Sequence, residues 1–190
     1  MKNTRTITGV AIFTAIVVVL QLLGSFIRFG AFSISLVLIP IVVGAALYGP
    51  LAGAWLGFVF GLVVLLSGDA GLFLGWNPLG TILTVLLKGI LAGACAGLVY
   101  RALAKWKSGV AAIAAAIAAP VVNTGVFFLG CTAFFLNDIS AMAAADGQPD
   151  TLRYIILVFI GGNFLFELLF NVVLSPVVMR LIRLGKKDKA

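Results

Sequence analysis

Apolar residues form long uninterrupted runs along the chain, and each run ends in a short segment rich in polar residues, glycine or proline. Each run is close to the ~20 residues that cross a hydrocarbon core of ~30 Å as an α-helix. The predicted spans cover residues 7–24, 32–48, 51–66, 79–100, 109–136 and 152–182. The pattern therefore predicts an all-α integral membrane protein, in which residues 1–190 form one compact bundle of six transmembrane helices.

Proline interrupts three of these spans. Pro40 lies near the middle of the second span and predicts a kink there, while Pro120 and Pro176 lie inside the fifth and sixth. The sixth span is longer than a bilayer needs, so we expect its end to project into the cytoplasm or to tilt.

Composition agrees with a membrane location. The chain is 63% hydrophobic and only 10% charged, and its mean hydropathy is +1.23. A soluble domain of this length needs more charge to cover its surface. The net charge of +7 would suggest nucleic acid for a soluble protein. Here the basic residues lie at the ends of apolar runs, where they set membrane orientation instead, and no nucleic-acid partner is expected.

The basic residues are divided unevenly between the two ends of the predicted bundle. Ten lie on the side of the termini, and only Arg28 and Arg153 lie on the other side. This bias predicts that both termini are cytoplasmic. The N-terminus superficially resembles a signal peptide, but the apolar run is too long and lacks a clean cleavage site, so we expect a retained first helix.

Small residues recur at four-residue spacing in three spans, where they let helix backbones approach closely. They are Ala11 and Ala15, then Gly53, Gly57 and Gly61, and then Gly89, Gly93 and Gly97. We interpret the two glycine series as packing within the bundle. For the alanine pair, internal packing and contact with another membrane subunit both stay open.

Polar residues of three spans are predicted to share one layer of the membrane. Counted from the outer helix ends, Lys88 lies about 13 Å deep, Asn163 about 16 Å and Asn123 about 19 Å. Thr124 follows Asn123, and Glu167 lies one turn deeper than Asn163. An intramembrane charge is costly, so Lys88 and Glu167 are each other's best available partners.

Two interpretations of this layer stay open. In the first, Lys88 and Glu167 form a buried pair that locks the fourth and sixth spans together. In the second, Lys88, Asn123 and Asn163 converge on a polar ligand that enters from outside, and Glu167 is the counter-charge that orients them. A proton relay fits poorly with one carboxylate and no histidine. Asn171 lies in the inner half, where helix packing is the expected role.

The outer loops supply further candidates. Trp76 and Asn77 lie in an apolar, glycine-rich loop over residues 67–78, and Arg28 lies in the first outer loop. Interfacial tryptophan is usually a belt anchor and a loop arginine is usually only solvated. Together with the buried layer, these loops describe a pocket that opens outward, with aromatic walls and few polar groups.

The sequence lacks the residues that ATP hydrolysis, metal binding and nucleophilic catalysis usually require. The chain has no phosphate-binding loop of the Gly-x-x-x-x-Gly-Lys-Ser/Thr type and no histidine. Cys95 and Cys131 lie in apolar runs and are expected to be buried thiols rather than a disulfide. We therefore expect no enzyme activity, no ATP hydrolysis by this chain, no metal site and no cofactor.

Several segments resemble the substrate-binding S components of energy-coupling factor (ECF) transporters. They are the Ala11/Ala15 pair, the hairpin over 47–53, Asn77-Pro78 ahead of Lys88-Gly89, and residues 120–125. The resemblance implies capture of a vitamin from outside, at the plasma membrane of a prokaryote. It also implies docking through Ala11 and Ala15 on a membrane coupling subunit, which two separate ABC ATPases drive.

The resemblance is strongest to S components assigned to pantothenate, through the segments over 120–125 and 162–167. A small hydroxylated anion suits Lys88 for its carboxylate and Asn123 and Asn163 for hydroxyl and amide groups. Riboflavin, stacked on Trp76 and phenylalanines, is the alternative vitamin. A self-sufficient small permease and a structural membrane subunit are the alternatives from other classes, although no three-plus-three repeat of spans is visible.

Overall fold

The computed structural model describes residues 2–26, 28–29, 32–33, 36–148 and 150–187. Within these ranges, the side chains of residues 2–3, 26, 28–29, 32–33, 163 and 186–187 lie outside the description. The helices are α1 (Lys2–Phe26), α2 (Leu38–Tyr48), α3 (Pro50–Leu66), α4 (Gly71–Trp76), α5 (Pro78–Leu103), α6 (Ser108–Phe134), α7 (Leu136–Ala145), α8 (Thr151–Tyr154), the π-helix η1 (Ile155–Gly161), α9 (Gly162–Val173) and α10 (Ser175–Lys187). One short antiparallel pair joins β1 (Arg28–Phe29) to β2 (Phe32–Ser33).

The architecture is helical, and long apolar helices make up most of it. Within the described ranges, four helical segments are long and apolar enough to cross a membrane: Thr4–Ser25, Pro78–Leu103, Ser108–Phe134 and Thr151–Val173. Helices α2 and α3 are apolar but shorter, at 11 and 17 residues, or about 16 and 26 Å. The predicted second span begins at residue 32, whereas the structure pairs residues 32–33 with β1 and begins α2 at Leu38.

Prolines mostly mark helix starts. Pro50 and Pro78 are the first residues of α3 and α5, and Pro176 is the second residue of α10. Pro40 is the third residue of α2, so the mid-helix kink expected there is replaced by a place in the first turn. A first-turn N–H has no intrahelical acceptor, so the missing donor of proline costs little at such a position. Pro120 is the exception and lies inside α6.

The two glycine series pack directly against each other and join α3 to α5. A Cβ atom added to Gly57 would lie 1.9 Å from the carbonyl oxygen of Gly89, and one added to Gly93 would lie 2.0 Å from that of Gly53. No side chain fits at these distances, so the backbones touch only because glycine is present. The predicted internal packing of the glycine series is confirmed.

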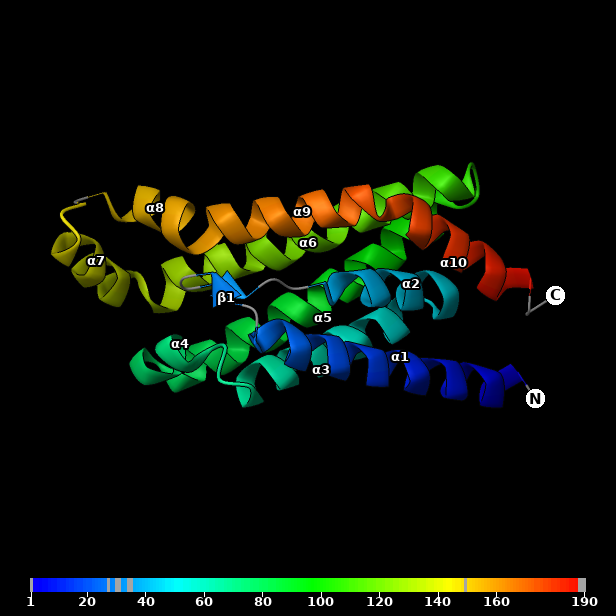
Figure 1. Cartoon of the computed structure of the whole chain (residues 1–190), viewed down its shortest axis with the longest axis horizontal. Helices are drawn as coiled ribbons and strands as arrows, with labels where there is room; N and C mark the ends of the chain where they lie inside the picture. The colour runs from blue at the N-terminus through cyan, green and yellow to red at the C-terminus, as the bar shows by residue number, and fades with distance from the viewer. Residues whose placement is uncertain (1, 27, 30–31, 34–35, 149, 188–190) are drawn as a thin grey trace.

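The elements form an elongated bundle in which α1 begins and α10 ends at the same end of the molecule (Figure 1). We call this the terminal end, and α4, α7 and α8 lie at the opposite end. Helices α1 and α3 run along one side, α6 and α9 run along the other, and α5 lies between them. Helix α1 lies at the edge of the bundle: 11% of its most apolar stretch is buried, whereas 39% of the corresponding stretch of α5 is buried.

The last predicted span is divided. It begins with α8, continues through the π-helix η1 into α9, and ends at Val173, after which α10 begins as a separate helix. Val178 and Ile182 bury one face of α10, while Arg180 and Arg183 are more exposed. The sequence predicts one long helix over residues 152–182. The structure has an apolar helical segment that ends at Val173 and a separate amphipathic helix, α10, that follows it.

Candidate ligand-binding site

Lys88 lies on α5 between aromatic rings from two neighbouring helices. Its ammonium is 5.7 Å from the centroid of the Phe60 ring on α3 and 5.2 Å from that of the Phe127 ring on α6. Cations are attracted to ring faces at such distances. Within the described part of the chain, these two rings are its close contacts, and no hydrogen bond or ion pair of Lys88 is formed there.

Glu167 is held by two asparagines from two helices. Nδ2 of Asn123 on α6 donates to Oε2 of Glu167 at 3.2 Å, and Nδ2 of Asn171 donates to the Glu167 backbone carbonyl at 2.8 Å. Asn123 and Glu167 are only 2% and 3% exposed. The carboxylate of Glu167 is therefore bonded to the amide of Asn123 inside the bundle.

Three buried oxygens near this layer have no hydrogen-bond partner among the described residues. They are Oδ1 of Asn123, Oδ1 of Asn171 and Oγ1 of Thr84. Thr84 lies one turn before Lys88 on α5, against Gly130 of α6, where a Cβ atom would lie only 2.3 Å from the threonine methyl carbon. Buried polar groups are normally satisfied, so each of these oxygens calls for an explanation. Thr84 was not among the sequence candidates, although it precedes Lys88 by four residues and so shares its helix face.

An aromatic cluster covers the layer from the side of the opposite end. Phe73 of α4 contacts the rings of Trp76, Phe127, Phe135 and Phe159 at centroid distances of 5.4, 5.5, 5.0 and 5.6 Å. Phe127 belongs to both sets, since it also faces Lys88. The rings come from α4, α6 and η1 and from Phe135, which lies between α6 and α7. Through Phe127 the cluster joins α4 to the polar layer.

The remaining sequence candidates lie around this centre. Asn77 is the N-cap of α5: its Oδ1 accepts from the Gly80 N–H at 3.0 Å, which gives its side chain a structural task. Thr124 is half-buried beside Asn123. Arg28 belongs to β1 and Asn163 to α9, and the side chains of both lie outside the described part of the structure.

A second polar cluster, not predicted from the sequence, joins α1 to the segment after α3. Oδ2 of Asp69 accepts from Nε2 of Gln21 at 2.8 Å, from Oγ of Ser25 at 2.7 Å and from Oγ of Ser67 at 3.1 Å. Gln21 is 2% exposed, so an amide of the first span is buried against a carboxylate of the loop. The signal was available: Gln21 is the one amide in that span, and Ser25 follows one turn later.

Comparison with known protein families shows to which family the chain belongs. The family model for "ECF transporter, substrate-specific component" matches residues 5–179 of the 190. The chain belongs to this family. Searches of curated proteins and of solved structures returned no match. As an ECF substrate-specific component, the protein is a transporter subunit of a class that binds a small molecule, works with a membrane coupling subunit and ATPases, and is generally not itself catalytic.

Helix α1 presents an apolar surface on the outside of the bundle. Ala11 and Ala15 are exposed on α1, and so are Ile12 and Ile16 beside them. Among the described residues, no group of three or more histidine, cysteine, aspartate or glutamate side chains could hold a metal ion. Both cysteines are free thiols, Cys131 buried and Cys95 half-buried. The ECF component thus has a polar layer inside the bundle and an apolar helix surface outside it.

Proposed function

We propose that this ECF component captures a small water-soluble vitamin, with pantothenate as the best candidate, from outside the cell. The observation that carries the proposal is Lys88, whose ammonium faces two aromatic rings within the bundle and has no oxygen partner among the described residues. A carboxylate of the ligand would complete this environment, because a charge-assisted hydrogen bond in a water-poor site is strong. Lys88 is then the anion-binding residue.

The polar groups around Lys88 match the rest of such a ligand. Oδ1 of Asn123 can accept a hydrogen bond from a hydroxyl or amide group, and Oγ1 of Thr84 can donate or accept one. Glu167 holds the amide of Asn123 and partly balances the charge of Lys88, so it orients the site rather than touching the ligand. Asn163, Thr124, Arg28 and Asn77 are proposed as further contacts.

The aromatic cluster supports riboflavin as the second candidate. Phe73 and Trp76 lie over the layer and present ring surfaces on which a flavin could stack. A single buried lysine suits the one carboxylate of pantothenate, whereas riboflavin carries no anionic group for it. We therefore place pantothenate first.

The proposed topology is six membrane spans with cytoplasmic termini in the plasma membrane of a prokaryote. The basic residues gather at the terminal end, as the positive-inside rule requires. In this arrangement α4 and the aromatic cluster face outside, and α1 carries Ala11 and Ala15 toward a coupling subunit driven by two ABC ATPases. The shorter helices α2 and α3 are the two spans that length alone does not identify.

Mass spectrometry of small molecules released from the purified protein tests the proposal. We expect pantothenate at close to one molecule per chain, and calorimetry of the stripped protein should reproduce its binding. Absence of any vitamin, together with no heat on titration, would support a structural subunit instead. Uptake into liposomes by this chain without ATPases would support a self-sufficient permease.

A further inference from the structure

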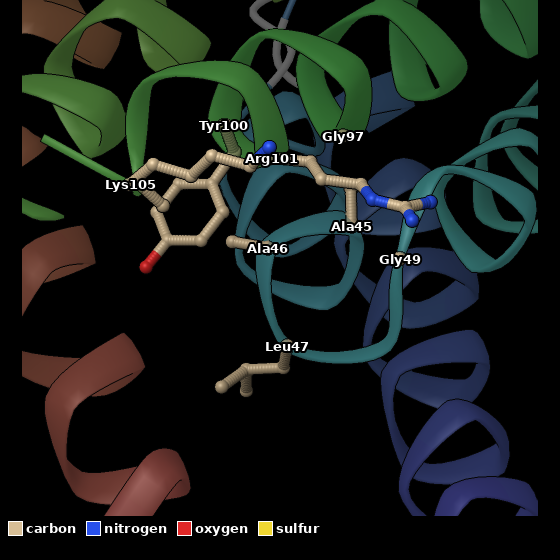
Figure 2. Close-up of a pocket in the computed structure, with 9 residues that line it drawn as sticks. Ala45, Ala46, Leu47, Gly49, Gly97, Tyr100, Arg101 and Lys105 are labelled. Atoms are coloured by element: carbon tan, nitrogen blue, oxygen red, sulfur yellow. The ribbon is translucent and has the colours of Figure 1, made fainter.

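A pocket lies at the terminal end of the bundle, far from the polar layer in the fold. It has a volume of about 470 Å³ and lies between the C-terminal turns of α2 and those of α5 (Figure 2). Five of its nine lining residues are small, and we call them the apolar floor: Ala45, Ala46, Gly49, Gly97 and Ala104. Leu47 and Tyr100 line the pocket as well. Because the side chains of the apolar floor are so short, two packed helices leave a hollow between them, and that hollow is mainly apolar.

Two basic side chains line the same pocket. Arg101 lies in the last turn of α5 and Lys105 in the turn that follows this helix, and both are exposed and line the pocket. In Figure 2 the guanidinium of Arg101 is directed toward the turn at Gly49, and the Lys105 side chain extends toward Arg101. None of the nine lining residues is acidic. The pocket therefore offers positive charge at its mouth and hydrocarbon-like surface beneath.

The neighbouring turn marks the depth of this pocket in a membrane. Trp106 lies between Lys105 and Lys107 in the connection from α5 to α6, and it is 87% exposed. An exposed tryptophan flanked by lysines is typical of the headgroup level of a bilayer. The pocket mouth, formed by the preceding turn of α5, is thus at the boundary between headgroups and hydrocarbon.

We propose that this pocket binds one anionic phospholipid of the inner leaflet. Its phosphate pairs with Arg101 and Lys105, and the first carbons of an acyl chain lie on Ala45, Ala46 and Ala104. Basic pockets between helices at the cytoplasmic side are suited to anionic headgroups. The site rests on the membrane orientation proposed above and does not depend on which vitamin is bound.

Native mass spectrometry of the full chain tests this site, using added phosphatidylglycerol and, for comparison, phosphatidylcholine. Each basic residue near an anionic lipid contributes about fivefold in affinity, so Arg101→Gln/Lys105→Gln should bind phosphatidylglycerol about 30-fold more weakly. Lys107→Gln/Arg180→Gln removes the same charge from exposed positions outside the pocket and should bind as the unmodified protein does. Equal weakening in both double variants would overturn the site in favour of general surface attraction.

A filling variant tests the apolar floor separately. Ala46→Phe places a ring in the hollow while it keeps both cations, and it should reduce phosphatidylglycerol binding as strongly as the double charge variant. Competition by soluble glycerol 3-phosphate at concentrations similar to those of the lipid would overturn the lipid assignment, because the acyl chain would then add nothing. Vitamin binding is expected to stay unchanged in all these variants, so failure of the lipid site is distinguishable from failure of the proposed function.

Discussion

Helix α5 has two faces of opposite character. Toward α3 it presents Gly89 and Gly93, which bring backbone against backbone with no space for a side chain. Toward α6 it presents Thr84, and its next turn carries Lys88, whose ammonium lies between Phe127 of α6 and Phe60 of α3. Buried oxygens without a partner among the described residues lie on this side. One helix thus separates a seam that is fully packed from a layer that is not.

The difference shows where a ligand can be accommodated. In lipid, helices associate through close packing of small residues, because apolar burial gives no advantage over lipid tails. The glycine seam therefore supplies rigidity, and it fixes the position from which Lys88 extends. The polar layer is stabilised less completely, since buried polar groups gain full value only when every partner is present. A bound ligand would supply what that layer lacks.

Filling the seam should have the largest effect. Gly57→Leu drives a side chain into the carbonyl of Gly89, and because backbone cannot move aside cheaply, we expect a loss of stability at or above the ~3 kcal/mol typical of severe overpacking. Gly125→Leu on α6 is the matched control, since no atom lies within 4 Å of its added Cβ. Thermal unfolding in detergent measures both. Equal stability of the two variants would contradict the packed seam.

Removing the cation should affect the other face almost as strongly, but in affinity rather than stability. Lys88→Met keeps the length and apolar stem, and we expect vitamin binding to weaken about 100-fold, in line with the cost of truncating a buried charge partner. Lys88→Arg should retain part of the affinity, and Lys107→Met, an exposed lysine, should retain all of it. Calorimetry that finds full affinity in a folded Lys88→Met protein would exclude a direct role.

A smaller effect is expected at the aromatic cluster. Phe73→Leu removes four edge-to-face ring contacts while it keeps an apolar side chain, and each such pair contributes about 0.5–1.5 kcal/mol. We expect vitamin affinity to fall about tenfold through faster release. Phe58→Leu on α3, whose ring pairs only with Trp55 among the described aromatic contacts, should leave affinity unchanged. Equal affinities of the Phe73 and Phe58 variants would separate the cluster from the site.

We expect the smallest effect on vitamin binding from substitutions on the exposed face of α1, because this helix packs on α2 and α3 rather than on α5. Ala15 is exposed, so Ala15→Trp should leave vitamin affinity within about twofold of that of the unmodified protein, as is usual for surface substitutions. Transport by the complete complex in liposomes should nevertheless be lost if this surface meets the coupling subunit. Loss of vitamin binding would instead indicate that Ala15 packs inside the bundle.

Spacing along the chain predicts that both glycine series pack within the bundle and that the polar residues lie at similar depths, because both features depend on helical periodicity and rise; the role of the polar residues in binding stays a prediction. The glycines repeat every four residues, and helix rise puts Lys88 and Asn123 at similar depth. The hydrogen-bond partner of Glu167 could not be obtained in this way. Depth does not determine how each helix is rotated, and rotation turns Glu167 toward Asn123 as its hydrogen-bond donor.

Local chemistry explains the other differences. Pro40 and Asn77 were interpreted by their place in an apolar run and in an outer loop, but both act at helix starts, where a missing donor or a side-chain acceptor is favourable. The bonds from Gln21 and Ser25 to Asp69 join residues 44 to 48 positions apart. Only the fold brings such distant positions together.

The π-helix η1 affects the direction in which buried residues of the final span point. Between Ile155 and Asn171, the described buried residues are Ile155, Phe159, Glu167 and Asn171, which are four or eight positions apart. In a regular α-helix, each step of four residues overshoots one turn by about 40°, so such a row would wind around the helix and reach lipid. A π-helical turn holds more residues and offsets part of this drift. The wide turn therefore keeps Glu167 and Asn171 on the same buried face as Phe159, and removing one residue from η1 would turn Glu167 by about 100° away from Asn123.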